Sequence, residues 1–544
     1  MPSQDIRVVV AIDFGTTYSG FAYAHVVKPE TIINDVWPRH IGQIKTNTVL
    51  QYDDKFQNVE SWGFAALAKK PKRKEKNSST KPVELFKLHL GDMPQSEKPY
   101  LPPNLDYLKA ITDFFEAMET VTTRWPGLDF MTQVLFVLSV PAEFSEESKR
   151  IMRNCVYNAN LISRRYSSRL QFTTEPEAAA LYCMEVISEN FDEFIEKTFL
   201  IVDCGGGTVD LTTRKLLSKS ELGEVTVRSG DFCGGNYVDQ EFINFLKTKV
   251  GTSAIDLLKE NLYGQYQYLV HEFCKNVKFP FTGNIEEFET YELDIEQICP
   301  AMIQYITGPE RDTMKDMEWI IEIDFEDVKN MFDKVIARII GLIRGQLYGD
   351  KSCSTIFLVG GFSESKYLQR RIKQEFQGVK HISVPRQPIA AVMRGAVKYG
   401  INRGHIKNRV LKYNYGMNGL RTCEARDPAN KMRLSGLVLY FKILAKKGTV
   451  MGLNETFSES CMPENSDQAT MRFQILISKD DDVKYCEEES VKKLGEFVVE
   501  LPNTHLEKPK QVDFELCFAE MEIKAYARNK YNNTEYNITC DLEF

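Results

Sequence analysis

The sequence contains no long hydrophobic run, and none of its apolar stretches approaches the roughly 18–20 residues needed to cross a bilayer. The N-terminus has no basic segment ahead of a long apolar one, so it lacks the pattern of a secretory signal. Twelve cysteines are scattered over 544 residues, and no two have CxxC spacing. Several lie inside apolar patterns, where a reduced thiol packs as a small core residue. We therefore expect a cytoplasmic protein, with a nuclear pool as the alternative, and neither a disulfide framework nor a membrane partner.

Several catalytic motifs are also absent. The chain has no GxxxxGK[ST] and no GxGxxG, which disfavours P-loop and Rossmann mechanisms. It has seven histidines but no HExxH, so nothing supports a zinc hydrolase, and no GxSxG elbow is present. The tripeptide Asp13-Phe14-Gly15 spells the DFG of protein kinases. Because it lies at the N-terminus with no HRD loop before it, a protein kinase is disfavoured.

Positive charge is not in excess. The chain has 68 Lys and Arg against 76 Asp and Glu, a formal net charge of −8, which argues against a nucleic-acid partner. Hydrophobic residues make up 43% and charged residues 26%, values typical of globular proteins, and the length favours several domains. The one basic run, residues 69–76, is most simply a solvated loop. A nuclear-import signal and an anion-binding loop are its alternatives.

Two kinds of pattern divide the chain. Through the first 400 residues, short apolar strands alternate with helix-length stretches such as Glu146–Asn160 and Phe325–Tyr348. Such alternation predicts an α/β fold with mainly parallel sheets. After about residue 405, β-branched and aromatic alternation between short polar turns predicts an antiparallel β domain. The expected strands are 7–12, 134–140, 199–202 and 356–359 in the first part, and 436–444, 469–478, 495–501, 511–518 and 521–528 in the second.

The most informative feature is a repeated loop. Asp13 to Tyr18 (DFGTTY) recurs in altered form at Asp203 to Asp210 (DCGGGTVD), and each copy follows a buried strand. Glycines let the backbone approach a phosphate, and successive N–H groups in such a turn form an anion-binding concavity. Threonine hydroxyls add donors, and a strand-end aspartate can hold hydrated Mg²⁺ through its waters. Two copies in matching contexts therefore predict a phosphate site between two related halves.

These segments resemble the actin, sugar-kinase and heat-shock ATPase superfamily, and within it the seventy-kilodalton heat-shock chaperones of the divergent twelve-type branch. The resemblance rests on AIDFGTTYSG (11–20), SVPAEF (139–144), TEPEAAALY (174–182), IVDCGGGTVDLT (201–212), DFCGGNYVD (231–239) and FLVGGFSESKYLQ (357–369). It implies an actin-like two-lobed ATPase fold with duplicated ribonuclease-H-like subdomains over residues 1–404. The lobes would meet near residue 198, with a linker at 405–413. A β-sandwich-like domain without a helical lid would follow at 414–544.

The resemblance also implies ATP or ADP with Mg²⁺ as cofactors. Mg²⁺ would be held through water by Asp13 and Asp203. The implied phosphate-binding residues are Gly15, Thr16, Thr17, Tyr18, Gly205, Gly206, Gly207 and Thr208, with Gly234 and Gly235 in the turn that opens the second lobe, and with Gly360, Gly361 and Ser363 in the adenosine turn. The implied catalytic residues are Lys87, Glu175, Asp203, Thr208 and Asp210, of which Glu175 and Asp210 would position the attacking water.

Some assignments stay open. Lys87 is also explained as a surface helical lysine, and Glu272 with Lys275, the candidate adenosine-contacting pair, as a surface ion pair. Glu364 stands where the chaperones carry an arginine, and Phe279 where a small hydroxyl residue is typical. Reduced or altered adenine binding is therefore the alternative to adenine binding of the usual kind. The linker is basic rather than leucine-rich and acidic, which puts coupling to J-domain partners in doubt.

The leading hypothesis is a monomeric, chaperone-like protein that hydrolyses ATP slowly. Hydrolysis would be coupled to lobe closure and to the binding of unfolded or extended peptide segments. One alternative is a non-catalytic nucleotide-sensing interaction or scaffold protein. A second is a small-molecule kinase of the same superfamily. Whether J-domain or nucleotide-exchange co-chaperones act on the chain is left open.

Overall fold

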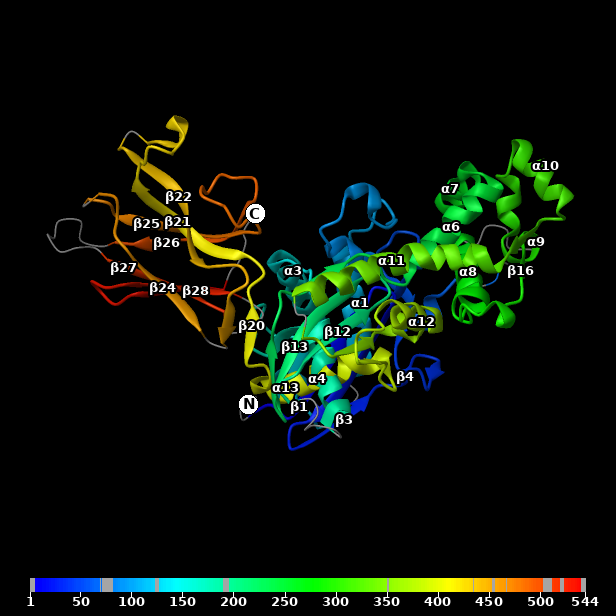
Figure 1. Ribbon diagram of the computed structural model, residues 1–544, viewed down its shortest axis with the longest axis horizontal. Coiled ribbons are helices and arrows are strands. Elements are labelled where there is room, and N and C mark those ends of the chain that lie inside the picture. Colours follow the sequence, from blue (N-terminus) through cyan, green and yellow to red (C-terminus); the bar gives the residue numbers. More distant parts are fainter. Residues whose placement is uncertain are drawn as a thin grey trace. The chain divides into compact units, whose positions relative to one another are not determined.

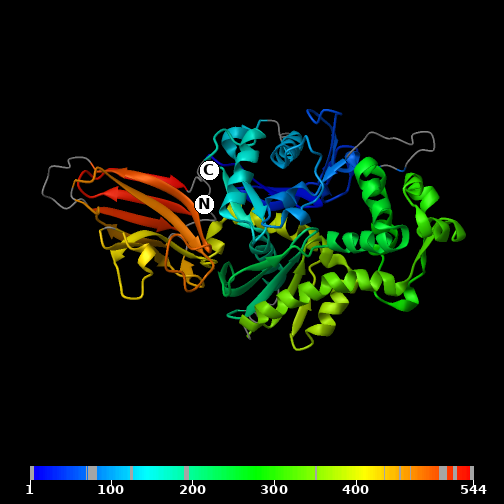
Figure 2. The ribbon, with the colours of Figure 1, turned by 90° about the horizontal axis from the view of Figure 1, so that it is seen from above.

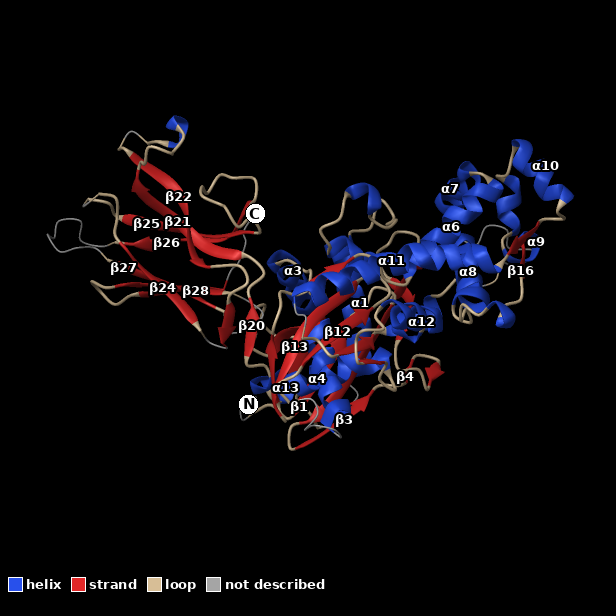
Figure 3. Cartoon of the chain, in the orientation of Figure 1, coloured by secondary structure: helices blue, strands red, loops and turns tan. Residues whose placement is uncertain are grey.

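A computed structural model describes residues 5–68, 70, 82–122, 127–188, 195–349, 352–433, 435–452, 455–465, 467–501, 511–518 and 523–539. Apart from Lys70, the basic run at 69–76 lies outside the described residues. The chain is a mixed α/β structure, in which helices and strands alternate before a part built of strands (Figure 1, Figure 3). It divides into two units. Unit 1 comprises Met1–Phe144, Ile151–Thr213 and Ser229–Arg403, and unit 2 comprises Ser145–Arg150, Arg214–Arg228 and Gly404–Phe544.

The first sheet of unit 1 carries the first glycine loop, which joins two of its strands. Its strand order is β11 (Leu170–Thr174), β10 (Val134–Val140), β1 (Val8–Asp13), β2 (Tyr18–His25) and β3 (Lys28–Ile33), with β6 (Thr46–Asn47) beside β2. The central strand β1 pairs in parallel with β10 and antiparallel with β2. Val9 to Ile12 are buried, as expected of a strand covered on both faces. The loop that carries Gly15 is therefore the turn of a hairpin.

A second sheet repeats this arrangement. Its order is β14 (Glu221–Glu224), β13 (Val209–Ser218), β12 (Thr198–Cys204), β18 (Thr355–Val359) and β19 (His381–Ser383), with β15 (Ser229–Asp231) beside β13. The fully buried β12 pairs in parallel with β18, and the second glycine loop joins β12 to β13. The described residues of this unit also form three smaller sheets: β4 (Val36–Trp37) with β5 (His40–Ile41), β7 (Val49–Tyr52) between β8 (Val59–Trp62) and β9 (Pro82–Glu84), and β16 (Tyr291–Asp294) with β17 (Ile320–Ile323).

The expectation of mainly parallel sheets was wrong. Both large sheets are mixed, with parallel pairs such as β1–β10 and β12–β18 beside antiparallel ones such as β1–β2. The physical reason is the glycine loop itself. A short turn after a central strand can only bring the chain back antiparallel, whereas a parallel neighbour needs a long crossover.

Helices flank these sheets (Figure 1). They are α1 (Tyr107–Thr122), α2 (Phe130–Gln133), α3 (Glu146–Asn158), α4 (Glu175–Ser188), α6 (Asn236–Val250), α7 (Thr252–Asn261), α8 (Tyr263–Phe273), α9 (Ile295–Ile298), α10 (Gly308–Asp316), α11 (Phe325–Gly349), α12 (Lys366–Glu375) and α13 (Ala391–Ile401). Helix α13 packs closely on α4, because a Cβ at Gly395 would lie 1.6 Å from the Ala178 carbonyl oxygen. This packing fixes α4, which begins at Glu175.

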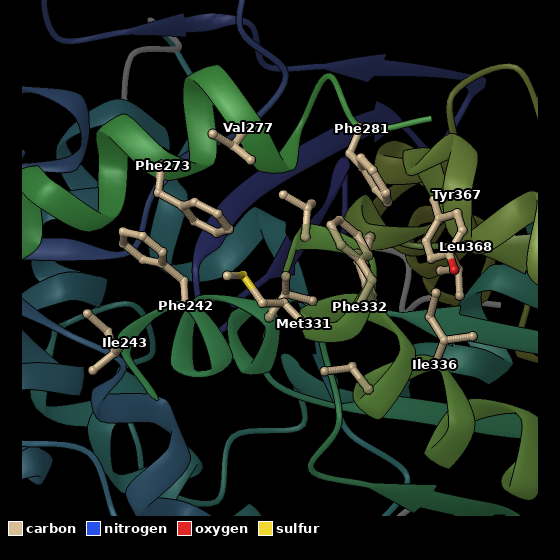
Figure 4. Close-up of a cluster of buried hydrophobic side chains, with 14 of the residues drawn as sticks. Phe242, Ile243, Phe273, Val277, Phe281, Met331, Phe332, Ile336, Tyr367 and Leu368 are labelled. Carbon is tan, nitrogen blue, oxygen red and sulfur yellow. The ribbon is translucent and has the colours of Figure 1, made fainter. Parts of the chain in front are cut away.

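Residues between Leu200 and Phe376 form a large hydrophobic core in the second half of unit 1. Helices α6, α8, α11 and α12 direct their side chains into it (Figure 4). Phe242 and Phe273 stack with ring centroids 4.0 Å apart, and Phe281 contacts Tyr367 edge-on at 5.0 Å. A π-helical turn, Cys274–Lys278, follows α8, and the buried Val277 and Phe281 hold the chain on either side of Lys278.

Unit 2 contains two four-stranded antiparallel sheets (Figure 2). One has the order β22 (Leu437–Ala445), β21 (Asn414–Thr422), β25 (Thr470–Ser478), β26 (Val491–Glu500), and the other β24 (Thr456–Cys461), β27 (Val512–Cys517), β28 (Lys524–Asn529), β29 (Glu535–Thr539). Residues of both sheets contribute to one hydrophobic core. Within it, Phe473 of β25 stacks on Phe514 of β27 with centroids 5.3 Å apart.

Unit 2 also includes the end of the β13–β14 hairpin. The segment after Gly404 lies along this hairpin: the Lys407 N–H donates to the Leu222 carbonyl at 2.9 Å. β20 (Asn408–Val410) then pairs with β23 (Val450–Gly452). The cysteines in the described part of the chain are free thiols. Within that part, no helix combines the length and apolar character needed to cross a membrane.

Candidate functional site

The first glycine loop is a rigid turn between β1 and β2. A Cβ at Gly15 would lie 2.1 Å from the Tyr18 carbonyl oxygen, so only glycine fits there. The Thr48 hydroxyl donates to the Gly15 carbonyl at 2.8 Å, and the buried ring of Phe14 anchors the turn in an aromatic cluster. Thr16 is buried, whereas Thr17 and Tyr18 are partly exposed at the loop.

The second loop is held by its own backbone. The Gly205 N–H donates to the Thr208 carbonyl at 3.0 Å. The N–H groups of Gly234, Gly235 and Asn236 donate to the carbonyls of Gly207, Gly205 and Gly206 at 2.8–3.1 Å. The predicted Gly-Gly turn therefore braces the second loop, and its N–H groups are already engaged with that loop.

The two loops meet face to face. A Cβ at Gly206 would lie 2.1 Å from the Thr17 hydroxyl oxygen, and one at Gly207 would lie 2.5 Å from the Thr16 hydroxyl oxygen. The absence of side chains on these glycines is what allows the approach. Loops separated by 190 positions in the sequence thus form one glycine- and threonine-lined structure.

Buried charged groups surround the loops. The Lys87 ammonium lies 2.7 Å from Glu175 Oε1, with the rings of Phe14 and Phe144 5.8 and 5.7 Å away. Lys87 is buried, so the structure does not support its reading as a surface helical lysine. Asp13 is paired with a residue that the sequence did not single out, Lys45, at 2.6 Å.

Burial and mutual repulsion make carboxylates of this cluster harder to ionise, so their pKa values rise. Burial, followed by the negative charges of Glu175 and Asp13, holds the pKa of Asp203 well above its usual range. Burial and the charge of Glu175 raise the pKa of Asp210 to about 7. Burial also raises the pKa of Glu175, although Lys87 opposes the shift. The site is short of positive charge, with four carboxylates facing two ammonium groups.

Asp210 has an unused carboxylate oxygen. Its Oδ1 accepts the Ala142 N–H at 2.7 Å, whereas its Oδ2 is buried and accepts no hydrogen bond from the described residues. A buried acceptor of this kind calls for a donor from water or a ligand. Within the described residues, no group of three or more His, Cys, Asp or Glu is arranged to ligate a metal directly.

Of the predicted adenosine-contacting pair, Glu272 lies on α8 and Lys275 on the π-helical turn that follows it. Lys275 is exposed, and Glu272 accepts a hydrogen bond from Asn276 at 3.2 Å. The buried lysine here is Lys278, which donates to the Gly235 carbonyl at 2.7 Å and to Asp239 Oδ1 at 2.5 Å. No sequence pattern marks Lys278, because helical spacing does not reveal the π-helical turn that directs its side chain inward.

The predicted adenosine turn lies against the second loop. Gly360 has a positive φ of 83°, and a Cβ there would lie 2.3 Å from Asp203 Oδ1. Gly361 is exposed, and a Cβ there would lie 3.9 Å from the Ile389 side chain, while the Ser363 hydroxyl donates to the Val359 carbonyl at 2.5 Å. Glu364 is exposed, and Phe279 is 64% exposed, so neither side chain is committed to the core.

Comparison with known proteins finds similar chains over nearly the full length. No protein-family profile matches the chain. Heat shock 70 kDa protein 12A of Mus musculus is 25% identical to it over 620 residues, covering 96% of this chain and 90% of the relative. The Homo sapiens protein of that name is 25% identical over 625 residues, with the same coverage. Human heat shock 70 kDa protein 12B is 24% identical over 653 residues, covering 99% of this chain and 92% of the relative. Over nearly its full length, the chain is therefore similar to the heat shock 70 kDa proteins 12A and 12B.

Proposed function

We propose that unit 1 is an actin-like, two-lobed nucleotide-binding body that binds ATP or ADP with Mg²⁺ and hydrolyses ATP slowly. The observation that carries this proposal is the meeting of the two glycine loops amid buried carboxylates and lysines. The two large sheets support duplicated ribonuclease-H-like lobes, because each places its loop after a central buried strand with a parallel neighbour. Similarity to the heat shock 70 kDa proteins supports the nucleotide.

The residues fit a phosphate chain with a hydrated divalent ion. Glycine backbone and threonine hydroxyls line the loops, and the carboxylates beside them outnumber the ammonium groups. Mg²⁺, when bound, neutralises the charge of the transferring phosphoryl group. Asp13 and Asp203, the buried strand-end carboxylates of the two loops, would hold its water shell. Lys87 would face the phosphates, and Asp210 Oδ2 would accept a proton of the attacking water.

ATP binding and single-turnover hydrolysis test this proposal. The wild type should bind ATP in the presence of Mg²⁺ and release phosphate slowly. Asp13→Ala/Asp203→Ala should lower the rate of single-turnover hydrolysis at least about tenfold, since two groups that hold the ion's water shell are gone. Lys109→Met, which removes a lysine paired with Asp113 at 2.7 Å elsewhere in unit 1, is the matched control. Hydrolysis equal in the wild type and the double variant would refute the ATPase. Binding without hydrolysis would favour the nucleotide sensor, and phosphate transfer to an added sugar would favour the kinase.

For unit 2 we propose a β-sandwich-like domain that binds extended apolar peptide segments. The supporting observation is a pair of neighbouring loops, one between β21 and β22 and the other between β24 and β25. They are bridged by Arg433 and Glu464 at 3.6 Å. Each loop carries an exposed methionine, Met432 (53%) and Met462 (69%). Methionine is flexible and polarisable, which suits surfaces that accept varied apolar side chains.

Peptide affinity in the presence of ATP and of ADP tests this second proposal. Met432→Glu/Met462→Glu should weaken binding of a fluorescent unfolded peptide by about tenfold or more, because charges replace apolar contacts. Val498→Glu, at a 45% exposed valine on β26, introduces the same change away from the loops and should leave the affinity unaltered. Equal weakening by both variants would contradict a site at the loops. Equal peptide affinity with ATP and with ADP would contradict coupling between the nucleotide state and peptide binding. Unit 2 would then be a scaffold.

A further inference from the structure

Lys45 is a buried cation inside the candidate nucleotide site. It lies just before β6, and its ammonium group is 2.6 Å from Asp13 Oδ2. The side chains of Lys45 and Asp13 are only 9% and 4% exposed. A lysine this deeply buried is almost always paired, and here its partner is the strand-end aspartate of the first loop.

The path of the lysine side chain is built into the first sheet. A Cβ at Gly20 of β2 would lie 2.9 Å from Lys45 Cγ and 2.9 Å from Met393 Sδ of α13. The missing side chain at Gly20 therefore leaves the space, here called the slot, through which the aliphatic part of the Lys45 side chain passes. Because backbone and core residues define this slot, the ammonium group is delivered to one place and is not a mobile surface charge.

From that place Lys45 acts on acids of both halves of unit 1. Its charge lowers the pKa of Asp203 and of Glu175, although burial raises both more strongly. It also opposes the rise that burial causes in the pKa of Glu364, in the predicted adenosine turn. The other buried lysine of the cluster, Lys87, is paired with Glu175 instead. Positive charge at Asp13 thus comes from Lys45.

A hydrated divalent ion beside Asp13 would share that carboxylate with a cation already in place. Two positive charges around one carboxylate repel each other, and the repulsion is strong where water is excluded. An ammonium fixed at Asp13 also offsets part of the repulsion between the site's carboxylates and an incoming polyphosphate. Both effects reduce what a divalent ion adds to nucleotide binding.

We propose that Lys45 is a built-in counter-cation of the phosphate site and makes nucleotide binding only weakly dependent on a divalent ion. The ligand class is a nucleoside di- or triphosphate, so the inference rests on the nucleotide-binding function proposed above. Lys45 is the residue that sets this dependence, and Gly20 is the position that admits it.

Calorimetric titration of the full chain with ADP, in Mg²⁺ and in EDTA, tests this role. In the wild type, removal of Mg²⁺ should raise the Kd less than about tenfold, whereas in Lys45→Gln it should raise the Kd by at least a further tenfold. Glutamine keeps an amide donor for Asp13 but carries no charge, and Lys45→Met is a second neutral variant should glutamine impair folding. Lys45→Arg, which restores the charge, should recover the wild-type ratio, and Lys109→Met should not change it.

The outcomes separate this inference from the proposed function. Equal ratios of the two Kd values in the wild type and the neutral variants would overturn the role of Lys45 while leaving nucleotide binding intact. Failure of Lys45→Arg to restore the ratio would also overturn it, since the effect would then not be one of charge. A wild type that binds no ADP in either buffer would overturn the nucleotide site itself, and the role of Lys45 with it.

Discussion

Glu224→Ala is expected to lower the free energy of unfolding of unit 2 by about 3–5 kcal/mol. The Glu224 side chain is 0% exposed, and its Oε1 lies 3.2 Å from a nitrogen of the equally buried Arg214. A nitrogen of Arg228 lies 3.4 Å from the same oxygen. Removing the carboxylate deletes a buried counter-ion of these guanidinium groups, which costs far more than the loss of one surface contact.

The same residue holds the segment that follows Gly404. Its Oε2 accepts the Val410 N–H at 2.7 Å, and its own N–H donates to Asn408 Oδ1 at 2.7 Å. Loss of Glu224 should therefore free this segment from the hairpin as well as weaken the fold. Urea unfolding measures the first effect, and the rate of limited proteolysis near residues 404–411 measures the second.

Glu221→Ala provides the matched control on the same hairpin. Glu221 pairs with Lys407 at 2.8 Å, but both side chains are more than a third exposed, and such pairs contribute about 0–1 kcal/mol. Replacing both charges of the buried pair, as in Arg214→Met/Glu224→Leu, should be less damaging than Glu224→Ala alone. If Glu224→Ala is no worse than Glu221→Ala, the buried pair does not stabilise unit 2.

The sequence predicted the elements whose patterns are local. The apolar run 134–140 coincides with β10, and the long periodic stretch 325–348 differs from α11 by one residue at its end. β21 and β24 were not predicted. β21 contains Gly416 and Gly419, and the residues of β24 are mostly polar, so neither sequence has the apolar alternation that marks a strand. Pairing with neighbouring strands, which the sequence does not display, forms them.

The candidate site divides in a similar way. The glycine loops were readable because backbone geometry demands glycine at fixed positions, as at Gly15. Lys87, singled out through family resemblance, lies beside Glu175, 88 positions away, a proximity that spacing does not reveal. Lys45 and Lys278 were missed, because a buried lysine and a surface lysine look alike in sequence. What buries Lys45 is a gap at Gly20, a feature of packing that no local pattern encodes.

The ionisation of Asp210 gives a prediction that joins stability to chemistry. Its pKa of about 7, raised by burial and by the charge of Glu175, means that the folded state keeps a proton which the unfolded chain loses near pH 4. The folded state therefore binds more protons between these values, and its stability should fall as the pH rises from about 4 to about 7. Asp210→Asn should remove this part of the pH dependence, which urea unfolding of the nucleotide-free protein measures.

Hydrolysis should respond to the same ionisation in the opposite direction. Only the deprotonated carboxylate accepts a proton from water, so single-turnover hydrolysis should rise as the pH passes about 7. Asp210→Asn, whose Oδ1 still accepts the Ala142 N–H, should lower the rate by about 10²- to 10³-fold and flatten the profile. Asp231→Asn is the control. Asp231 lies on β15, the strand beside Asp210, and this partly exposed aspartate pairs with Arg338 of α11. A rate in Asp210→Asn that matches the wild type would assign the water-positioning role elsewhere, with Glu175 the remaining carboxylate of the cluster that the resemblance gives that role. Asp210→Asn could flatten the pH profile of hydrolysis and leave the pH dependence of stability unchanged. In that case Asp210 is the catalytic carboxylate, and a different group titrates in the free protein.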